Sequence, residues 1–342
     1  MYTISLSELT PLLQHVALAE REPVMIWGPP GVGKSDAVAA VFRAINAPMV
    51  DIRLSQYDSV DLRGIPVPQH DTGMTSWFAP STLPFVGNPR FDATAPVIGL
   101  FLDEINSASP AVSAVAYQLI NDRRVGEHVL MDNVVVIAAG NRDGDKGVTT
   151  KMPLPLANRF THVEIGVDVD AWCTWALGAG MPHAGIAFLQ FRKPLLSTFD
   201  PKKPSVAFAT PRTWAKALRY FASGMPEATK MAAMAGAIGE GPSAEFWGFV
   251  DVWQQMTPLA AILADPTGVP LPDEASMRYA VAVNVSGSMT LANASACMAF
   301  LCRMDPEFVV MAWQLAVRRD PTLLTAPEFI TFSKRYKAVF AR

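Results

Sequence analysis

The 342-residue sequence predicts an α/β fold, a parallel sheet of five strands followed by a mainly helical region. Three observations carry this prediction. Short apolar segments alternate with segments of helical pattern in the first half of the chain, which is typical of βα units. A glycine-rich loop joins the first apolar segment to a helical one. After about residue 168 the strand pattern ends and helical patterns continue.

The predicted strands are short and rich in branched apolar residues. The third is a nearly continuous apolar run, as expected for a strand buried on both faces. The five strands are predicted over 24–27, 49–54, 97–102, 133–139 and 162–165.

The segments around these strands are predicted from periodicity and from turn residues. Residues 1–22 carry leucines at helical spacing and predict an amphipathic helix. The stretch 58–96 is longer than a crossover needs, with a hairpin expected around 70–73, and long insertions are often functional. Further helical pattern covers 172–192, 211–223 and the chain from 226 onward, with breaks at 239–242 and 265–272.

Composition and charge exclude several classes of protein. The net charge of −3 and the pI near 6.0 argue against a chain that chiefly coats nucleic acid. The three cysteines lack C-x-x-C spacing and the five histidines are scattered, so no dedicated metal cluster is expected. The N-terminus lacks a signal-peptide pattern, and 280–301 is too polar for a comfortable membrane span. We expect a cytoplasmic protein without a membrane segment.

The glycine-rich loop carries the most specific motif. Residues 28–35 fit G-x-x-x-x-G-K-[ST] in full, between a predicted strand and a helix. Backbone N–H groups of such a loop cradle phosphates, and the helix N-terminus adds partial positive charge. The sequence therefore predicts an ATP site. The residues predicted to bind the nucleotide are Gly28, Pro29, Pro30, Gly31, Val32, Gly33, Lys34, Ser35 and Asp36.

Two carboxylates end the third predicted strand. Asp103 and Glu104 directly follow its apolar run, and ligands of α/β sheets bind at the carboxyl ends of strands. We expect Ser35 and Asp103 to hold Mg²⁺, largely through water, and Glu104 to act as general base on the attacking water. The alternative is a purely structural acidic pair at a strand end.

Three further polar residues suit phosphoryl transfer. Asn141 follows the fourth strand and could bond the γ-phosphate and the attacking water, although Asn is also a common turn residue. Arg159 could stabilise transition-state charge from a neighbouring molecule, or form an intramolecular salt bridge. Arg212 begins a predicted helix, where it could reach the γ-phosphate or lie on the surface.

This ordered set resembles the AAA+ ATPases and, among them, the MoxR family. The glycine loop resembles Walker A and residues 100–104 resemble Walker B, while Asn141, Arg159 and Arg212 correspond to sensor 1, the arginine finger and sensor 2. Residues 61–64 with 73–80 resemble the family's helix-2 insert. The resemblance spans about residues 20–220 and implies an AAA+ P-loop domain over 1–168, with the insert at about 58–96. It further implies a helical lid over 169–224, which leaves 225–342 as an accessory helical region.

The resemblance also implies how the protein works. Such ATPases assemble as rings, most often hexamers, and remodel a protein client. MoxR-type members typically partner proteins with a von Willebrand factor A domain and act as chaperones. In this chain, Tyr57, Met74, Trp77 and Phe78 could grip a client from the insert, or be packed within it.

Two other functions remain open. One is a nucleotide-gated assembly scaffold in which hydrolysis is incidental. The other is a nucleic-acid motor, which the net acidity and the absence of a long Lys/Arg cluster count against. A simple P-loop kinase fits worst, because it would not need Asn141, Arg159 and Arg212.

Overall fold

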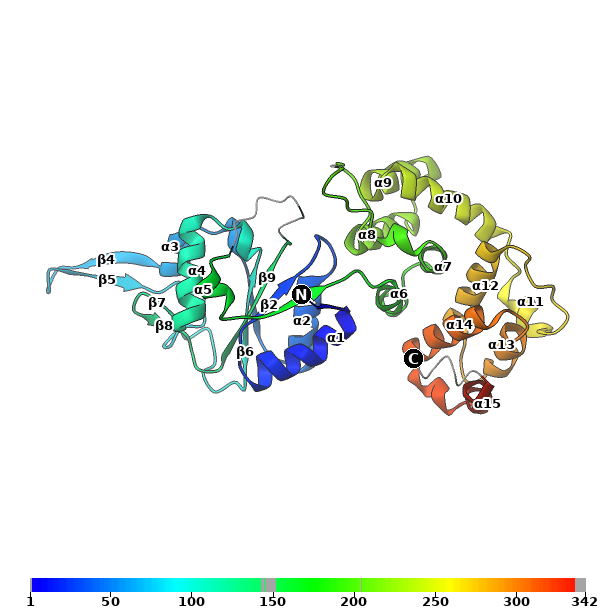
Figure 1. The fold of residues 1–342 in the computed structure, drawn as a ribbon, viewed down its shortest axis with the longest axis horizontal. Helices are drawn as coiled ribbons and strands as arrows, with labels where there is room; N and C mark the ends of the chain where they lie inside the picture. The colour runs from blue at the N-terminus through cyan, green and yellow to red at the C-terminus, as the bar shows by residue number, and fades with distance from the viewer. Residues whose placement is uncertain (1, 143–144, 146–151, 204, 336–342) are drawn as a thin grey trace. The chain divides into compact units, whose positions relative to one another are not determined.

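The computed structural model describes residues 2–142, 145, 152–203 and 205–335, and the last residues of the predicted accessory region lie outside this part. The chain divides into two compact units (Figure 1). The first unit is Met1–Gly166 with Asp200–Lys203, and the second is Val167–Phe199 with Pro204–Arg342. The finer division of the second unit into a lid and an accessory region stays a prediction.

A parallel sheet of six strands forms the centre of the first unit, which confirms the α/β fold. All five predicted strands belong to it, and the prediction of five strands misses one at the edge. In spatial order the strands are β1 (Thr3–Ile4), β10 (Thr161–Ile165), β2 (Val24–Trp27), β9 (Val134–Gly140), β6 (Ile98–Asp103) and β3 (Met49–Arg53).

The additional strand, β1, comes from the segment that was expected to be helical. Thr3 and Ile4 pair in parallel with Glu164 and Ile165 of β10. Ser5 then accepts a hydrogen bond from the backbone N–H of Glu8 and starts α1 (Leu6–Leu12), which continues as the π-helix η1 (Leu13–Ala19). Two residues are too few to show the alternation of a strand.

The sheet has an apolar core on each face, which explains its continuous apolar strands. Along β9, Val135 and Ile137 pack with α1, η1 and α2 (Lys34–Ala44). Val134 and Val136 belong to the opposite core, together with residues of α4 (Pro110–Asp122). This burial fixes the carboxyl ends of β2, β6 and β9 at one edge of the sheet.

The predicted insertion contains α3 (Ser59–Arg63) and an antiparallel hairpin of β4 (Ile65–Gln69) and β5 (Met74–Phe78). This confirms the expected hairpin, which extends outward from the first unit (Figure 1). A second, unpredicted hairpin, β7 (Arg124–Val125) and β8 (His128–Val129), lies beside it. The backbone N–H of Trp77 donates to Glu127 Oε1 over 2.9 Å and ties the two hairpins together.

The second unit is helical and has two apolar clusters. The pattern over 172–192 divides into two helices, because Gly180 adopts a φ of 67° and Pro182 precedes the next helix. The expected break near 239 is present, where Gly239 has a φ of 91°. The helices are α6 (Val169–Gly178), α7 (His183–Phe191), α8 (Pro211–Phe221), α9 (Glu227–Ile238), α10 (Glu240–Gln254), α11 (Leu259–Ala264), α12 (Ala275–Ser288), α13 (Ala294–Leu301), α14 (Pro306–Arg319) and α15 (Pro327–Arg335).

Residues 280–301, which the sequence marks as apolar but interrupted, fall into α12 and α13. Within the described residues, no helix has both the length and the apolar character that crossing a membrane requires.

Candidate functional site

The glycine-rich loop joins β2 to α2 and has the backbone of an anion cradle. Gly31 and Gly33 have φ values of 73° and 105°, which side chains with a Cβ rarely adopt. Such turns direct successive N–H groups to one side, and α2 begins directly after Gly33. The partial positive charge of a helix N-terminus favours a phosphate at this place.

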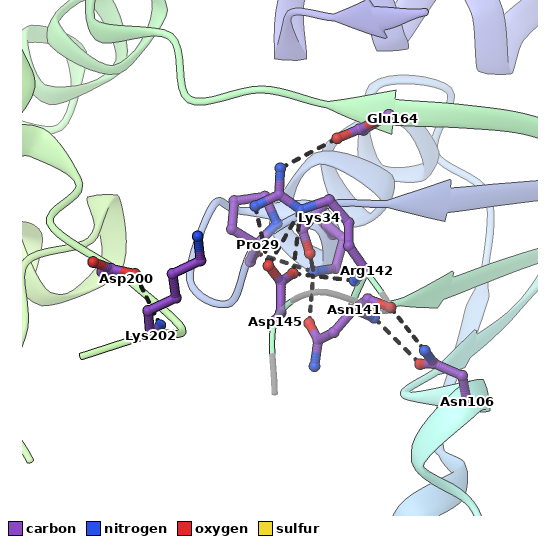
Figure 2. Close-up of polar contacts among 10 residues, drawn as sticks. Pro29, Lys34, Asn106, Asn141, Arg142, Asp145, Glu164, Asp200 and Lys202 are labelled. Atoms are coloured by element: carbon purple, nitrogen blue, oxygen red, sulfur yellow. Dashed lines mark hydrogen bonds and ion pairs between the residues drawn. The ribbon is translucent and has the colours of Figure 1, made fainter. Parts of the chain in front are cut away.

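Lys34 lies almost buried at the start of α2, with 8% of its surface exposed. Its Nζ donates to the carbonyl oxygens of Gly28 and Pro29, at 2.8 and 3.2 Å, and to Asn141 Oδ1 at 3.3 Å (Figure 2). These oxygens carry no net charge. A phosphate oxygen would bind this ammonium more strongly than each of these neutral acceptors does.

Ser35 and Asp103 meet across the ends of α2 and β6. Ser35 Oγ donates to Asp103 Oδ2 over 2.8 Å, and the backbone N–H of Glu104 donates to Asp103 Oδ1 over 2.9 Å. Asp103 is 8% exposed. Both carboxylate oxygens are thus held in place at the edge where the strands end.

This donor set fits Mg²⁺. The ion prefers oxygen ligands, keeps several of its waters and usually takes only one or two protein oxygens beside substrate phosphates. The Ser35 hydroxyl and the Asp103 carboxylate supply such oxygens next to the loop. No group of three or more His, Cys, Asp or Glu side chains suited to a metal occurs in the described part of the chain.

Glu104 follows β6 in a left-handed backbone conformation, with φ of 56° and ψ of 33°. Its carboxylate Oε2 accepts a hydrogen bond from Ser55 Oγ. Ser55 lies in the 3-10 turn η2 (Leu54–Gln56), which follows β3, the neighbour of β6 in the sheet. A left-handed conformation is uncommon for a residue with a side chain, and such outliers cluster at functional sites.

Asp51 adds negative charge near the same edge. Partial burial raises the pKa of its carboxyl, and the charge of Asp103 raises it further, while Arg53 opposes the shift. The carboxylates of Asp51 and Asp103 therefore repel each other electrostatically, while Arg53 at the end of β3 attracts both.

Asn141 directly follows β9, and its neighbours hold it on both sides. The Asn106 side chain bonds its backbone, and Arg142 is tied to two carboxylates, at 3.1 Å from Asp145 and 3.2 Å from Glu164 (Figure 2). The hydrogen bond to Asp145 is the main reason that the pKa of Arg142 is raised. The Asn141 amide is thus presented to Lys34 from a braced backbone.

The structure therefore brings five predicted site residues to one edge of the sheet: Lys34, Ser35, Asp103, Glu104 and Asn141. We call these five residues the strand-end cluster. The other predicted loop residues surround it: Gly28 and Pro29 are buried, Pro30 and Gly31 are half-buried, Val32 packs into the core, and Asp36 is exposed in the first turn of α2.

The two predicted arginines lie outside the cluster. Arg159 follows the short helix α5 (Leu154–Ala157) in the first unit and is exposed. Arg212 is exposed in the first turn of α8 in the second unit. Neither side chain has a hydrogen bond or ion pair with any residue that the structure describes.

Two residues that contact the cluster were not predicted, Ser55 and Asn106. Ser55 lies just past the predicted strand 49–54. A polar residue at that place indicates a contact with Glu104 only when β3 is known to lie beside β6. Asn106 directly follows the predicted acidic pair and Ile105, but nothing in its spacing indicates a contact with Asn141.

Comparison with known proteins agrees with this site. Residues 23–160 match the family model described as an AAA domain of the dynein-related subfamily. Among solved structures, NtrX from Brucella abortus in complex with ADP is 14% identical, with 100% of this chain and 69% of that chain covered and a TM-score of 0.42. A mutant of RuvB from Thermotoga maritima is 14% identical, with 72% of this chain and 69% of that chain covered and a TM-score of 0.37.

The assignment to a family depends on the match of residues 23–160 alone. The matched segment runs from the residue before β2 to the residue before β10 and contains the whole strand-end cluster. The part of the chain that carries the site is therefore similar to the AAA domains of the dynein-related subfamily.

Proposed function

We propose that the protein hydrolyses ATP at the strand-end cluster. The observation that carries this proposal is the convergence of an ammonium, a hydroxyl, two carboxylates and an amide beside a phosphate-type loop. Phosphoryl transfer needs little covalent chemistry from the protein, so positioned charges of this kind supply most of the catalysis.

Each member of the cluster has a role that its chemistry suits. The loop amides and Lys34 bind the phosphates of ATP, and Ser35 and Asp103 hold Mg²⁺, largely through water. When bound, Mg²⁺ neutralises charge on the phosphate oxygens. Glu104 accepts a proton from the attacking water, and Asn141 orients that water and the γ-phosphate.

The two exposed arginines support a shared site. An arginine given to a neighbouring molecule has to be exposed in its own subunit, as Arg159 is. We propose that the protein forms a ring, with a hexamer expected, in which Arg159 acts in the site of the adjacent subunit. Arg212, from the second unit, acts as a second sensor of the γ-phosphate.

The insert supports a protein client. Met74, Trp77 and Phe78 on the β4–β5 hairpin are exposed, by 66%, 38% and 61%. Tyr57 instead packs against the core of the first unit, so it does not join the client surface. We propose that the hairpin contacts a client of a MoxR-type chaperone in the cytoplasm, and that the partner carries a von Willebrand factor A domain.

The backbone of the hairpin favours side-chain contacts with that client. Pro66 and Pro68 have no N–H, so their pairs with Trp77 and Thr75 are the pairs without ladder hydrogen bonds. The outer edge of β4 therefore lacks two donors, and Glu127 occupies the N–H of Trp77 on the outer edge of β5. Both edges are poorly suited to adding a client strand.

Glu104→Gln tests the hydrolysis proposal. The variant keeps the size of the side chain but cannot accept a proton, so we expect kcat to fall roughly 10²- to 10⁴-fold while ATP still binds. Glu22→Gln, a change of an exposed glutamate on the same unit, is the matched control. Turnover of Glu104→Gln at the wild-type rate would contradict the role of Glu104. Client activity that survives in this variant would favour a nucleotide-gated scaffold.

A further inference from the structure

Asn106 makes a two-point contact with the backbone of Asn141. Its Nδ2 donates to the carbonyl oxygen of Asn141 over 2.7 Å, and its Oδ1 accepts from the N–H of Asn141 over 3.2 Å (Figure 2). Asn106 is 5% exposed and lies in the 3-10 turn η3 (Ile105–Ser107), directly after Glu104.

This contact replaces sheet hydrogen bonds at the point where they end. β9 finishes at Gly140, and the last pair in its ladder with β6 joins Ala138 to Leu102. On the side of β6, the backbone of Asn141 therefore lies beyond the end of the ladder. The amide of Asn106 supplies one donor and one acceptor in its place, as a strand would.

The approach is so close that a side chain at residue 140 would displace the groups around it. A Cβ at Gly140 would lie 2.6 Å from Asn106 Oδ1 and 2.9 Å from Met25 Cε. Contacts this short force one of the groups to move. The absence of a side chain at residue 140 thus permits the contact between Asn106 and Asn141.

From this geometry we infer that Asn106 is a positioning residue, which holds Asn141 at the right place relative to Glu104 for hydrolysis. The inference rests on the proposed ATP hydrolysis. Asn106 and Glu104 are two residues apart, and Asn141 Oδ1 contacts Lys34 Nζ. We call the two hydrogen bonds between Asn106 and the backbone of Asn141 the clamp. The clamp therefore connects the end of β6, which carries the general base, to the amide at the end of β9. Loss of the clamp lets Asn141 move relative to both.

Two substitutions break the clamp from opposite sides. Asn106→Ala removes both hydrogen bonds, and Gly140→Ala displaces the Asn106 amide without altering it. Since small misplacements in an active site are costly, we expect each to lower kcat roughly 10- to 100-fold. KM for ATP should change less than about threefold, because the loop and Lys34 bind the phosphates.

Asn133→Ala is the matched control. Asn133 is also a buried asparagine of the first unit, and its Nδ2 donates to the carbonyl oxygens of Asp92 and Ala95, at 3.2 and 2.8 Å. It precedes β9 at the other end of that strand. We expect its loss to lower the melting temperature and leave kcat unchanged. A role of Asn106 in stability alone predicts the same behaviour for Asn106→Ala.

The double variant of Asn106 and Asn141 makes the test specific. If Asn106 acts through Asn141, Asn106→Ala should lower kcat no further in an Asn141→Ala background. Full additivity would overturn the inference, as would wild-type kcat in both Asn106→Ala and Gly140→Ala. If Asn106→Ala does not fold, Gly140→Ala alone and with Asn141→Ala gives the same comparison. Wild-type protein without any ATP turnover would instead contradict the proposed function.

Discussion

The strand-end cluster and the two exposed arginines differ in the burial and the hydrogen bonding of their charged side chains. Lys34 and Asp103 are nearly buried and bonded to groups of their own unit. Arg159 and Arg212 are exposed, with no bonded partner among the described residues. The cluster residues are thus held by groups of their own unit, whereas the two arginines are exposed and available to a partner outside the described residues.

This difference has a physical reason. A group that must bind ATP in every subunit gains from being fixed beforehand, because less order is lost on binding. A charge that serves an adjacent subunit has to stay outside its own core, since burying it unpaired would cost several kcal/mol. The comparison therefore favours a site that two subunits complete together.

The largest expected effect is the loss of kcat in Arg159→Ala, which tests whether the exposed arginine acts in catalysis. Arg159→Ala removes the charge that we propose acts in the adjacent site, and an arginine supplied in trans contributes about 10³- to 10⁵-fold to kcat. We expect a loss of that order with ATP binding and assembly preserved, measured as turnover beside mass photometry. Arg43→Ala, at the exposed end of α2, is the control. Undiminished ATP turnover in Arg159→Ala would contradict a role of this arginine in the site of an adjacent subunit.

Lys34→Ala tests the strand-end cluster, and we expect it to weaken the binding of ATP. The buried ammonium of Lys34 is proposed to pair with the phosphates of ATP. Loss of one partner of a desolvated charge pair costs about 2–5 kcal/mol. We expect that loss in the free energy of ATP binding, measured by calorimetry. Lys230→Ala in α9 is the control. Unchanged affinity for ATP would mean that the nucleotide binds elsewhere.

The smallest effect concerns Asp51 and the melting temperature. Because its pKa is raised above 3.8, the folded protein holds a proton that the unfolded chain releases. This carboxyl therefore lowers stability as pH rises above 3.8 and has little effect below it. We expect Asp51→Asn to raise the melting temperature at pH 7 and to change it little at pH 3. A larger gain at pH 3 than at pH 7 would contradict this sign.

Much of the fold and of the cluster could be predicted from the sequence. Asp103 ends one apolar strand and Asn141 directly follows another, and in a parallel sheet all such ends lie at one edge. Lys34 and Ser35 carry a motif whose local geometry the motif itself defines. The two-residue strand β1 was missed because a segment that short has no period.

The remaining contacts depend on distant parts of the chain. Ser55 meets Glu104 only because β3 lies beside β6, an order that no local pattern defines. Asn106 meets Asn141 because η3 turns toward the end of β9. The proposed role of Arg159 depends on another molecule, and a sequence can indicate the type of residue but not its partner.

The most direct test of the shared site mixes two inactive variants. Arg159→Ala keeps Glu104, and Glu104→Gln keeps Arg159, so a mixed ring contains sites with both groups. A head-to-tail ring pairs each site with one neighbour, so an equal mixture should make about a quarter of the sites complete. We predict that mixing and reassembling the two proteins restores ATP turnover to about that fraction of the wild-type rate. Turnover no higher than that of the separate variants, in rings shown to contain both, would contradict the shared site.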